Sequence, residues 1–270
     1  MFRSAVLPSE AVQVKTPPTA ASKPVMVFGT DLAGSHESET ATLAVRLWGA
    51  EPGVGSGETG FAYALPFRST TGGLLGPDVI SNYVETLRHR MEVQPDTIFQ
   101  ILRFGCEKDA HDDATMVKIF ADMPANCQLP GLWRRQLDPS HPARLLICDP
   151  GANLKTPEWQ EKLKQYLSLN APLWNAPAIE LVTVGSARVV VANDLAAKAL
   201  QLRHRIFGPD EARYGSNAMI AAEIQATWYA THLLNLFDFE QTGQPAQIRI
   251  LSTATRAGLE IDQINIGGTR

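Results

Sequence analysis

The chain has 270 residues, of which 44% are hydrophobic and 19% are charged, and its formal net charge is -4. This composition is typical of a folded globular protein large enough for two domains, and it excludes a disordered chain and a strongly basic nucleic-acid binder. No apolar run reaches the roughly 18 residues that span a bilayer, and three cysteines without metal-ligand spacing favour reduced thiols in a cytoplasmic protein.

Two segments divide the sequence. Residues 1–23 are rich in proline, serine, threonine and alanine and lack the apolar stretch of a signal peptide, which predicts a flexible tail. The run Asp-Pro-Ser-His-Pro within residues 138–143 breaks both helical and strand periodicity, which predicts a linker. We therefore expect a first domain over residues 24–137 and a second over residues 144–270.

The first domain is expected to begin with a buried strand over residues 25–28 and to continue, after a glycine-rich loop, with a strand over residues 61–66. From Pro77 onward, apolar residues at three- and four-residue spacing predict an amphipathic helix with proline in its first turn. A strand over residues 97–104 and a short helix over residues 114–120 complete this half.

Strands and helices alternate regularly after the linker. The expected strands cover residues 145–148, 179–184, 233–237 and 259–266. One expected helix begins at Thr156, and a second runs through residues 194–204. Two more cover residues 218–229 and 246–257. Such alternation implies right-handed crossovers and a mainly parallel sheet, with ligands at the carboxyl ends of strands, here after Cys148, Val184 and Phe237. The sequence thus predicts an α/β fold in both halves.

The loop after the first strand combines glycines with ionisable side chains. Its candidate residues are Asp31, His36, Gly53, Gly55, Gly57 and Gly60. Glycines at such spacing let backbone N–H groups approach an anion closely, as in phosphate-binding loops. Glu37 and Glu39, however, stand where such a loop would have bare amides. The pattern indicates a nucleotide pocket whose chemistry has been altered.

Short motifs run through the first half in a fixed order. They are Phe28-Gly29, Gly34 with His36, the glycine stretch, Tyr63-Ala64-Leu65-Pro66, Gly105-Cys106, Asn126-Cys127 and Leu129-Pro130. In this order they resemble a phage-associated, macrodomain-like protein family over about residues 25–135. The resemblance implies a macrodomain-like fold and a pocket for an ADP-ribose-like nucleotide. The ligand-binding residues it implies are Gly29, Thr30, Gly53, Gly55, Gly57, Gly60, Tyr63 and Gly105.

The chain departs from this family at charged positions. Asp31 replaces an asparagine, Glu37 and Glu39 replace glycines, and the second glycine loop contains Glu107 and Asp109. Two like charges about 4 Å apart repel by roughly 4 kcal/mol at an effective dielectric of about 20. If both loops line the pocket, these acids oppose a diphosphate.

A second group of motifs follows the linker. It consists of Val184-Gly185-Ser186-Ala187-Arg188 after a strand, Asn217 opening a helix, and Gly243 before a helix that ends in Ala257-Gly258-Leu259. These elements resemble the Rossmann-like SLOG superfamily of nucleotide-binding and nucleotide-processing domains. The resemblance implies a Rossmann-like fold with Gly185, Ser186, Arg188 and Asn217 at a ligand site. Here too the loops depart from the family, since the first strand ends in Cys148-Asp149-Pro150-Gly151.

Each candidate also has a structural interpretation. Asp31 and His36 can form a base with its orienting partner, or can be a helix-capping residue and a surface residue. The acids around His111 can hold a hard metal ion or simply be solvated. Cys106 can be a nucleophile, although its acidic neighbours favour an inert, buried thiol. Arg188 can bind phosphate or face solvent.

Two functions remain open. In one, the protein binds, sequesters or hydrolyses ADP-ribose or a related NAD-derived nucleotide, with Asp31 and His36 as catalytic residues. In the other, favoured because loop chemistry is lost in both halves at once, the two nucleotide-binding folds persist as a scaffold. The protein is then a phage structural, assembly or host-interaction component, located in the bacterial host cytosol if phage-encoded, whose partner is a protein or a second copy. We expect no cofactor, no metal, and neither a membrane nor nucleic acid as a partner.

Overall fold

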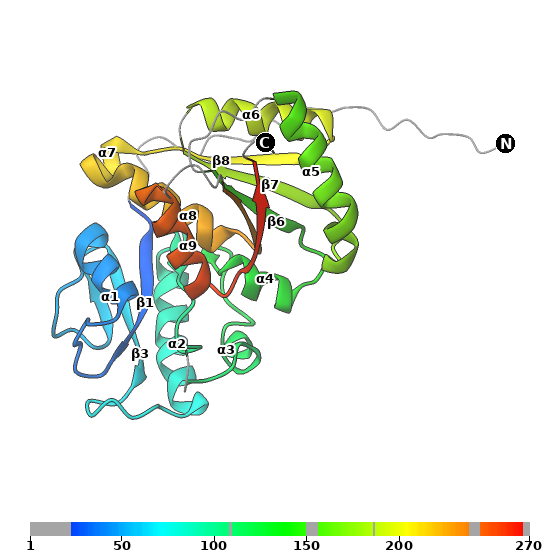
Figure 1. Ribbon diagram of the computed structural model, residues 1–270. Coiled ribbons are helices and arrows are strands. Elements are labelled where there is room, and N and C mark those ends of the chain that lie inside the picture. Colours follow the sequence, from blue (N-terminus) through cyan, green and yellow to red (C-terminus); the bar gives the residue numbers. More distant parts are fainter. Residues whose placement is uncertain (1–22, 108–109, 150–155, 186, 238–243, 267–270) are drawn as a thin grey trace.

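The computed structural model describes residues 23–107, 110–149, 156–185, 187–237 and 244–266. Two five-stranded sheets, one from each half of the chain, are covered by helices, which confirms the predicted α/β class. The helices α8 (Ala218–Tyr229) and α9 (Pro245–Arg256) lie between the two sheets (Figure 1). None of the helices in these ranges is long and apolar enough to cross a bilayer.

The first sheet has the order β2-β3-β1-β4-β5. Its strands are β1 (Val25–Asp31), β2 (Gly57–Thr59), β3 (Ala62–Arg68), β4 (Phe99–Ile101) and β5 (Cys127–Gln128). The central strand β1 pairs in parallel with β3 and β4, and only β2 runs antiparallel. Because the chain crosses from β3 over to the other side of β1, the strand order reverses between β1 and β4. The carboxyl ends of parallel strands at such a reversal form a crevice.

Helices cover both faces of this sheet. One face packs against α2 (Pro77–Val93), α3 (Asp113–Ile119) and α4 (Gly131–Leu137). The other carries α1 (Glu39–Leu43) and a π-helical turn, η1 (Ala44–Trp48). The buried residues of α2 are Ile80, Val84, Leu87 and Met91, which is the single apolar face that the sequence predicts.

The second sheet is parallel throughout, in the order β10-β9-β6-β7-β8. Its strands are β6 (Ala143–Cys148), β7 (Ile179–Val184), β8 (Arg203–Phe207), β9 (His232–Phe237) and β10 (Glu260–Asn265). The first strand of this half is central and the chain winds outward on both sides, which is the strand order of a Rossmann-like sheet. One face packs against α5 (Thr156–Asn170), η2 (Ala171–Trp174) and α6 (Ala187–Ala199). The short helices α7 (Glu211–Tyr214) and η3 (Gly215–Asn217) lead into α8, on the other face.

The prediction of a helix running through residues 194–204 is wrong at its end. Helix α6 ends at Ala199, and Gln201 adopts a left-handed backbone conformation with φ 55°, which breaks the helix. Residues 203–207 then form the edge strand β8. Its exposed basic side chains, which look like a helix tip in the sequence, are typical of a protected sheet edge.

A single apolar core joins the two halves. It includes Met26, Phe28 and Trp48 from the first half and Val182 and Ala221 from the second. Helix α8 is rich in alanine and is buried on nearly all sides, because it lies between the sheets and small side chains let both approach. Trp48 and Tyr214 meet edge to face across this junction, with ring centroids 5.8 Å apart.

Candidate functional site

A cavity of about 170 Å³ lies at the carboxyl ends of β1 and β3. Its lining residues are Gly29, Thr30, Asp31, Ser35, His36, Glu37, Ser38, Phe67 and Arg68. Four of the predicted site residues therefore come together here, namely Gly29, Thr30, Asp31 and His36. Parallel α/β sheets bind ligands at this edge.

The Asp31 carboxylate is held by the turn that follows β1. Its Oδ1 accepts a hydrogen bond from the Ser35 backbone N–H at 3.1 Å, and its Oδ2 accepts one from Ser35 Oγ at 2.5 Å. Partial burial raises the pKa of Asp31, but these bonds and the neighbouring backbone N–H groups outweigh it, so the pKa lies below its ordinary value. Asp31 is therefore an ionised acceptor whose geometry is fixed by Ser35.

His36 is buried, with only 6% of its surface exposed. Its Nε2 lies 3.0 Å from the carbonyl oxygen of Val54, and its ring meets Phe28 edge-on at 5.0 Å. Because a carbonyl only accepts, Nε2 carries the proton, and Nδ1 is an acceptor when the ring is neutral. Among the described residues, this Nδ1 has no hydrogen-bond partner, and neither has the buried Oγ1 of Thr30. A buried polar atom without a partner costs about 1–3 kcal/mol, so two at one cavity need an explanation.

Glycine backbones pack directly against one another beside this cavity. A Cβ on Gly34 would lie 2.6 Å from the backbone of Val54, and one on Gly55 would lie 2.3 Å from the carbonyl oxygen of Leu32. A Cβ on Gly60 would lie equally close, 2.3 Å, to the carbonyl oxygen of Gly49. The close approach of loop to loop therefore requires glycine at these positions. The residues Gly53, Gly55, Gly57 and Gly60 are not among those that line the cavity.

Tyr63 and Gly105 also lie outside the cavity lining. Tyr63 is buried in the core beneath α2, where burial and then the charge of Glu58 raise its pKa. Gly105 has a left-handed φ of 69°, and its carbonyl accepts a hydrogen bond from the His111 backbone N–H at 2.9 Å. Both residues have structural roles in the described fold.

The acids divide between the cavity and the junction of the two halves. Glu37 lines the cavity, whereas Glu39 forms an ion pair with Arg256 of α9. Glu107 is exposed and not part of the lining, and Asp109 lies outside the described residues. The lining thus carries two carboxylates, Asp31 and Glu37, and the guanidinium of Arg68. Sequence reasoning missed Arg68, although its position at the end of a strand parallel to β1 was a usable signal.

A polar network near Cys106 serves the structure. Arg103 donates to both carboxylate oxygens of Asp113, at 2.8 and 2.7 Å, and to the carbonyl oxygen of Arg256 at 2.8 Å. Burial, followed by the charge of Asp113, raises the pKa of the Cys106 thiol to about 12, which makes it a poor nucleophile. Within the described ranges, no three histidine, cysteine or acidic side chains come close enough to hold a metal ion.

The predicted site in the second half is only partly described. Gly185 directly follows β7 and has a φ of 132°, Arg188 is exposed on α6, and Asn217 occupies the N-cap position of α8. Ser186 and the loops that follow β6 and β9 lie outside the described residues. A ligand at this edge stays a prediction.

No protein-family model, no curated protein and no solved structure matches this chain. The function is therefore inferred from the fold and from the side chains of the cavity.

Proposed function

We propose that the protein binds a nucleotide-derived ligand of the ADP-ribose type in the cavity at the ends of β1 and β3. The observation that carries the proposal is the lining of this cavity, where the carboxylates of Asp31 and Glu37 and the guanidinium of Arg68 lie beside His36 and Thr30. The Nδ1 of His36 and the Oγ1 of Thr30 are buried without a hydrogen-bond partner within the described residues, so a ligand that comes to bond them removes the cost of leaving them unpaired.

The polarity of the lining indicates which end of such a ligand enters. The His36 Nδ1 and the carboxylates of Asp31 and Glu37 are acceptors, which suits sugar hydroxyl groups and opposes a phosphate. Arg68 is the cation of the lining and suits the phosphate that follows the sugar. We therefore place a ribose in the cavity and the adjoining phosphate at Arg68.

Binding rather than hydrolysis is the proposal. Ser35 holds both oxygens of Asp31, and Val54 engages Nε2 of His36. These contacts fix the two side chains as parts of a binding surface. The Nδ1 of His36 has no partner within the described residues, and we assign it to a sugar hydroxyl of the ligand.

The test is a thermal-shift series with ADP-ribose, NAD and cyclic nucleotides. A ligand at about 100 times its Kd adds about 2.7 kcal/mol to stability, which is readily measured. We expect a shift with ADP-ribose that is lost in Thr30→Val and His36→Gln and retained in His89→Gln, whose side chain is exposed on α2. An unchanged melting temperature with all these ligands would show the proposal to be wrong.

A second candidate function is an interaction scaffold of the phage type. It is favoured by Glu39, whose carboxylate does not line the cavity but forms an ion pair elsewhere. This residue joins α1 to α9 across the two halves through Arg256, and the shared core holds the same junction. On this reading the two sheets present a fixed surface to a protein partner or a second copy. Absence of any nucleotide shift, together with concentration-dependent assembly in light scattering, would favour the scaffold over the ligand pocket.

A further inference from the structure

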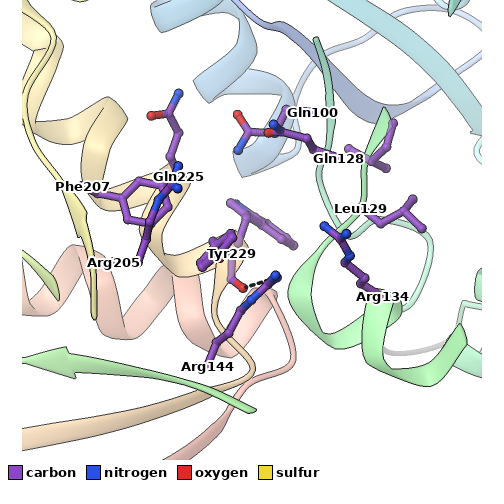
Figure 2. A pocket seen from close by; sticks show the side chains of 11 residues that line it. Gln100, Gln128, Leu129, Arg134, Arg144, Arg205, Phe207, Gln225 and Tyr229 are labelled. Carbon is purple, nitrogen blue, oxygen red and sulfur yellow. Dashed lines mark hydrogen bonds between the residues drawn. The ribbon is translucent and has the colours of Figure 1, made fainter. Parts of the chain in front are cut away.

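A second cavity, of about 100 Å³, lies where the two halves meet and shares no lining residue with the first. Its polar lining residues are Gln100, Gln128, Arg134, Arg144, Arg205 and Gln225. Figure 2 shows Arg205 and Gln225 on one side of this space and Gln100, Gln128 and Arg134 on the other. The aromatic rings of Phe207, Trp228 and Tyr229 complete the wall.

One of the three arginines is neutralised within the protein. Arg144 is buried, stacks on the Tyr229 ring at 3.8 Å and forms an ion pair with Glu180 at 3.3 Å. It also donates to the carbonyl oxygen of Tyr229 at 3.4 Å, at the C-terminal end of α8. The positive charge of Arg144 is therefore balanced by the Glu180 carboxylate and by the negative end of the helix dipole.

The other two arginines form no ion pair within the described residues. Within the described residues, neither Arg134 nor Arg205 lies within ion-pair distance of a carboxylate, and none of the lining residues is acidic. Arg134 contacts His141 through Nε at 3.0 Å, and Arg205 lies over the rings of Phe207 and Tyr229 at 5.5 and 5.7 Å. Two guanidinium groups without an ion pair at a partly enclosed cavity favour an anion, although the charge of Arg134 also acts on the nearby Asp138.

Two further side chains of the lining have buried polar atoms without partners. Trp228, only 2% exposed, has an unsatisfied Nε1–H donor, and Gln100, 9% exposed, has an unsatisfied Oε1 acceptor. A ligand that satisfies these atoms as well as the arginines accepts hydrogen bonds from an indole and guanidinium groups and donates one to an amide oxygen. Hydrogen phosphate has both abilities, since it carries acceptor oxygens and one O–H.

We propose that this cavity between the two sheets is a binding site for phosphate, either free hydrogen phosphate or the phosphate of a small monoester whose sugar hydroxyl reaches Gln100. This site is independent of the proposed ADP-ribose pocket.

The test is calorimetric titration of the full chain with inorganic phosphate, with AMP and with sulfate, at constant ionic strength. We expect Arg205→Gln and Arg134→Gln to weaken binding of phosphate or AMP by about tenfold each, because a charge-assisted hydrogen bond is lost. Arg203→Gln is the matched control, since Arg203 lies on the same strand and is exposed but is not part of the lining. All three positions are exposed, so the variants should fold.

Phosphate binding that is lost in Arg205→Gln and kept in Arg203→Gln supports a site for free phosphate, and the same pattern with AMP alone supports a site for the monoester. No binding of either probe, equal binding in both variants, or sulfate binding as tight as phosphate would overturn the proposal, because sulfate at neutral pH has no O–H for Gln100. His36→Gln should leave this binding unchanged, which separates the result from the fate of the ADP-ribose pocket.

Discussion

At the scale of single residues, close backbone packing explains why glycine is required in the loop that the sequence pattern suggests as a phosphate-binding loop. Gly34 has a φ of 67°, and the space where its Cβ would stand is filled by the backbone of residues 53 and 54. Gly72 has a similar φ of 82°, but no atom lies within 4 Å of the position of its Cβ. A comparison of the two glycines therefore distinguishes the cost of a left-handed backbone conformation from the cost of a steric clash.

Gly34→Ala is expected to lower the free energy of unfolding by about 2 kcal/mol or more, because strain and a backbone clash add. Gly72→Ala should cost only about 1 kcal/mol, the strain of the left-handed conformation. Urea unfolding of both variants measures the difference. Equal losses would contradict the close packing of the Gly34 loop against Val54.

His232 is expected to make stability depend on pH. It stacks on Trp174 with ring centroids 4.3 Å apart, and burial, followed by the charge of Arg135, lowers its pKa from 6.5 to about 4. The folded protein thus holds the neutral ring. The stability that the buried neutral ring contributes to the folded state is fully present above the unfolded pKa of 6.5. This stability is lost as the pH falls from 6.5 toward 4.

His232→Phe keeps an aromatic stack and removes the titration, so the loss of stability between pH 7 and pH 5 should be smaller than in the wild type. Urea midpoints at the two pH values give the measurement. The control is His89→Gln, a substitution at an exposed histidine of α2 outside the core. A wild-type protein equally stable at both pH values would argue against a buried neutral His232.

At the scale of elements, α8 and α9 are joined by a buried carboxylate. Glu223 of α8 is 4% exposed and accepts two hydrogen bonds from Arg249 of α9, at 2.8 and 2.9 Å. Removing only the arginine leaves a buried charge without its partner. The pair therefore fixes how α9 lies on α8, and with it the junction of the two sheets.

Arg249→Met is expected to destabilise the protein by about 2 kcal/mol, less than for a fully buried pair because Arg249 is partly exposed. A cavity of about 240 Å³ is lined by Glu223, Arg249 and the exposed Arg46. The control is Arg46→Met, which should cost less than about 0.5 kcal/mol. Chemical denaturation of both variants tests this. Similar small losses would mean that solvent, rather than Arg249, stabilises Glu223.

At the scale of the whole molecule, the shared core predicts that both halves unfold together. Residues of β1, η1, β7 and α8 belong to one apolar cluster, so separating the halves exposes side chains from each. Arg103 adds a polar link, since it donates to the carbonyl oxygen of Arg256 in the other half.

Thermal unfolding followed by tryptophan fluorescence and by far-ultraviolet circular dichroism should give one coincident transition. The tryptophans report on both halves, with Trp48 and Trp133 in the first and Trp159, Trp174 and Trp228 in the second. Two separated transitions would contradict a single cooperative core. The same measurement on Ala221→Asp, which puts a charge into the junction, should show a lower midpoint in both signals.

The sequence by itself determined the α/β class, the position of most strands, and the helix over residues 218–229, which agrees with α8 to the residue. It also pointed to Asp31 and His36 at the end of β1. These features follow from spacing and propensity among neighbours a few residues apart, which a sequence displays directly.

Only the tertiary structure decided which loops and side chains meet. The pairing of Glu39 with Arg256, the burial of α8 between two sheets, and the cavity that gathers Arg134, Arg144 and Arg205 all join segments from different helices and strands. No local pattern specifies such contacts, because they arise from the crossovers that bring distant segments together and from burial that each segment alone cannot achieve.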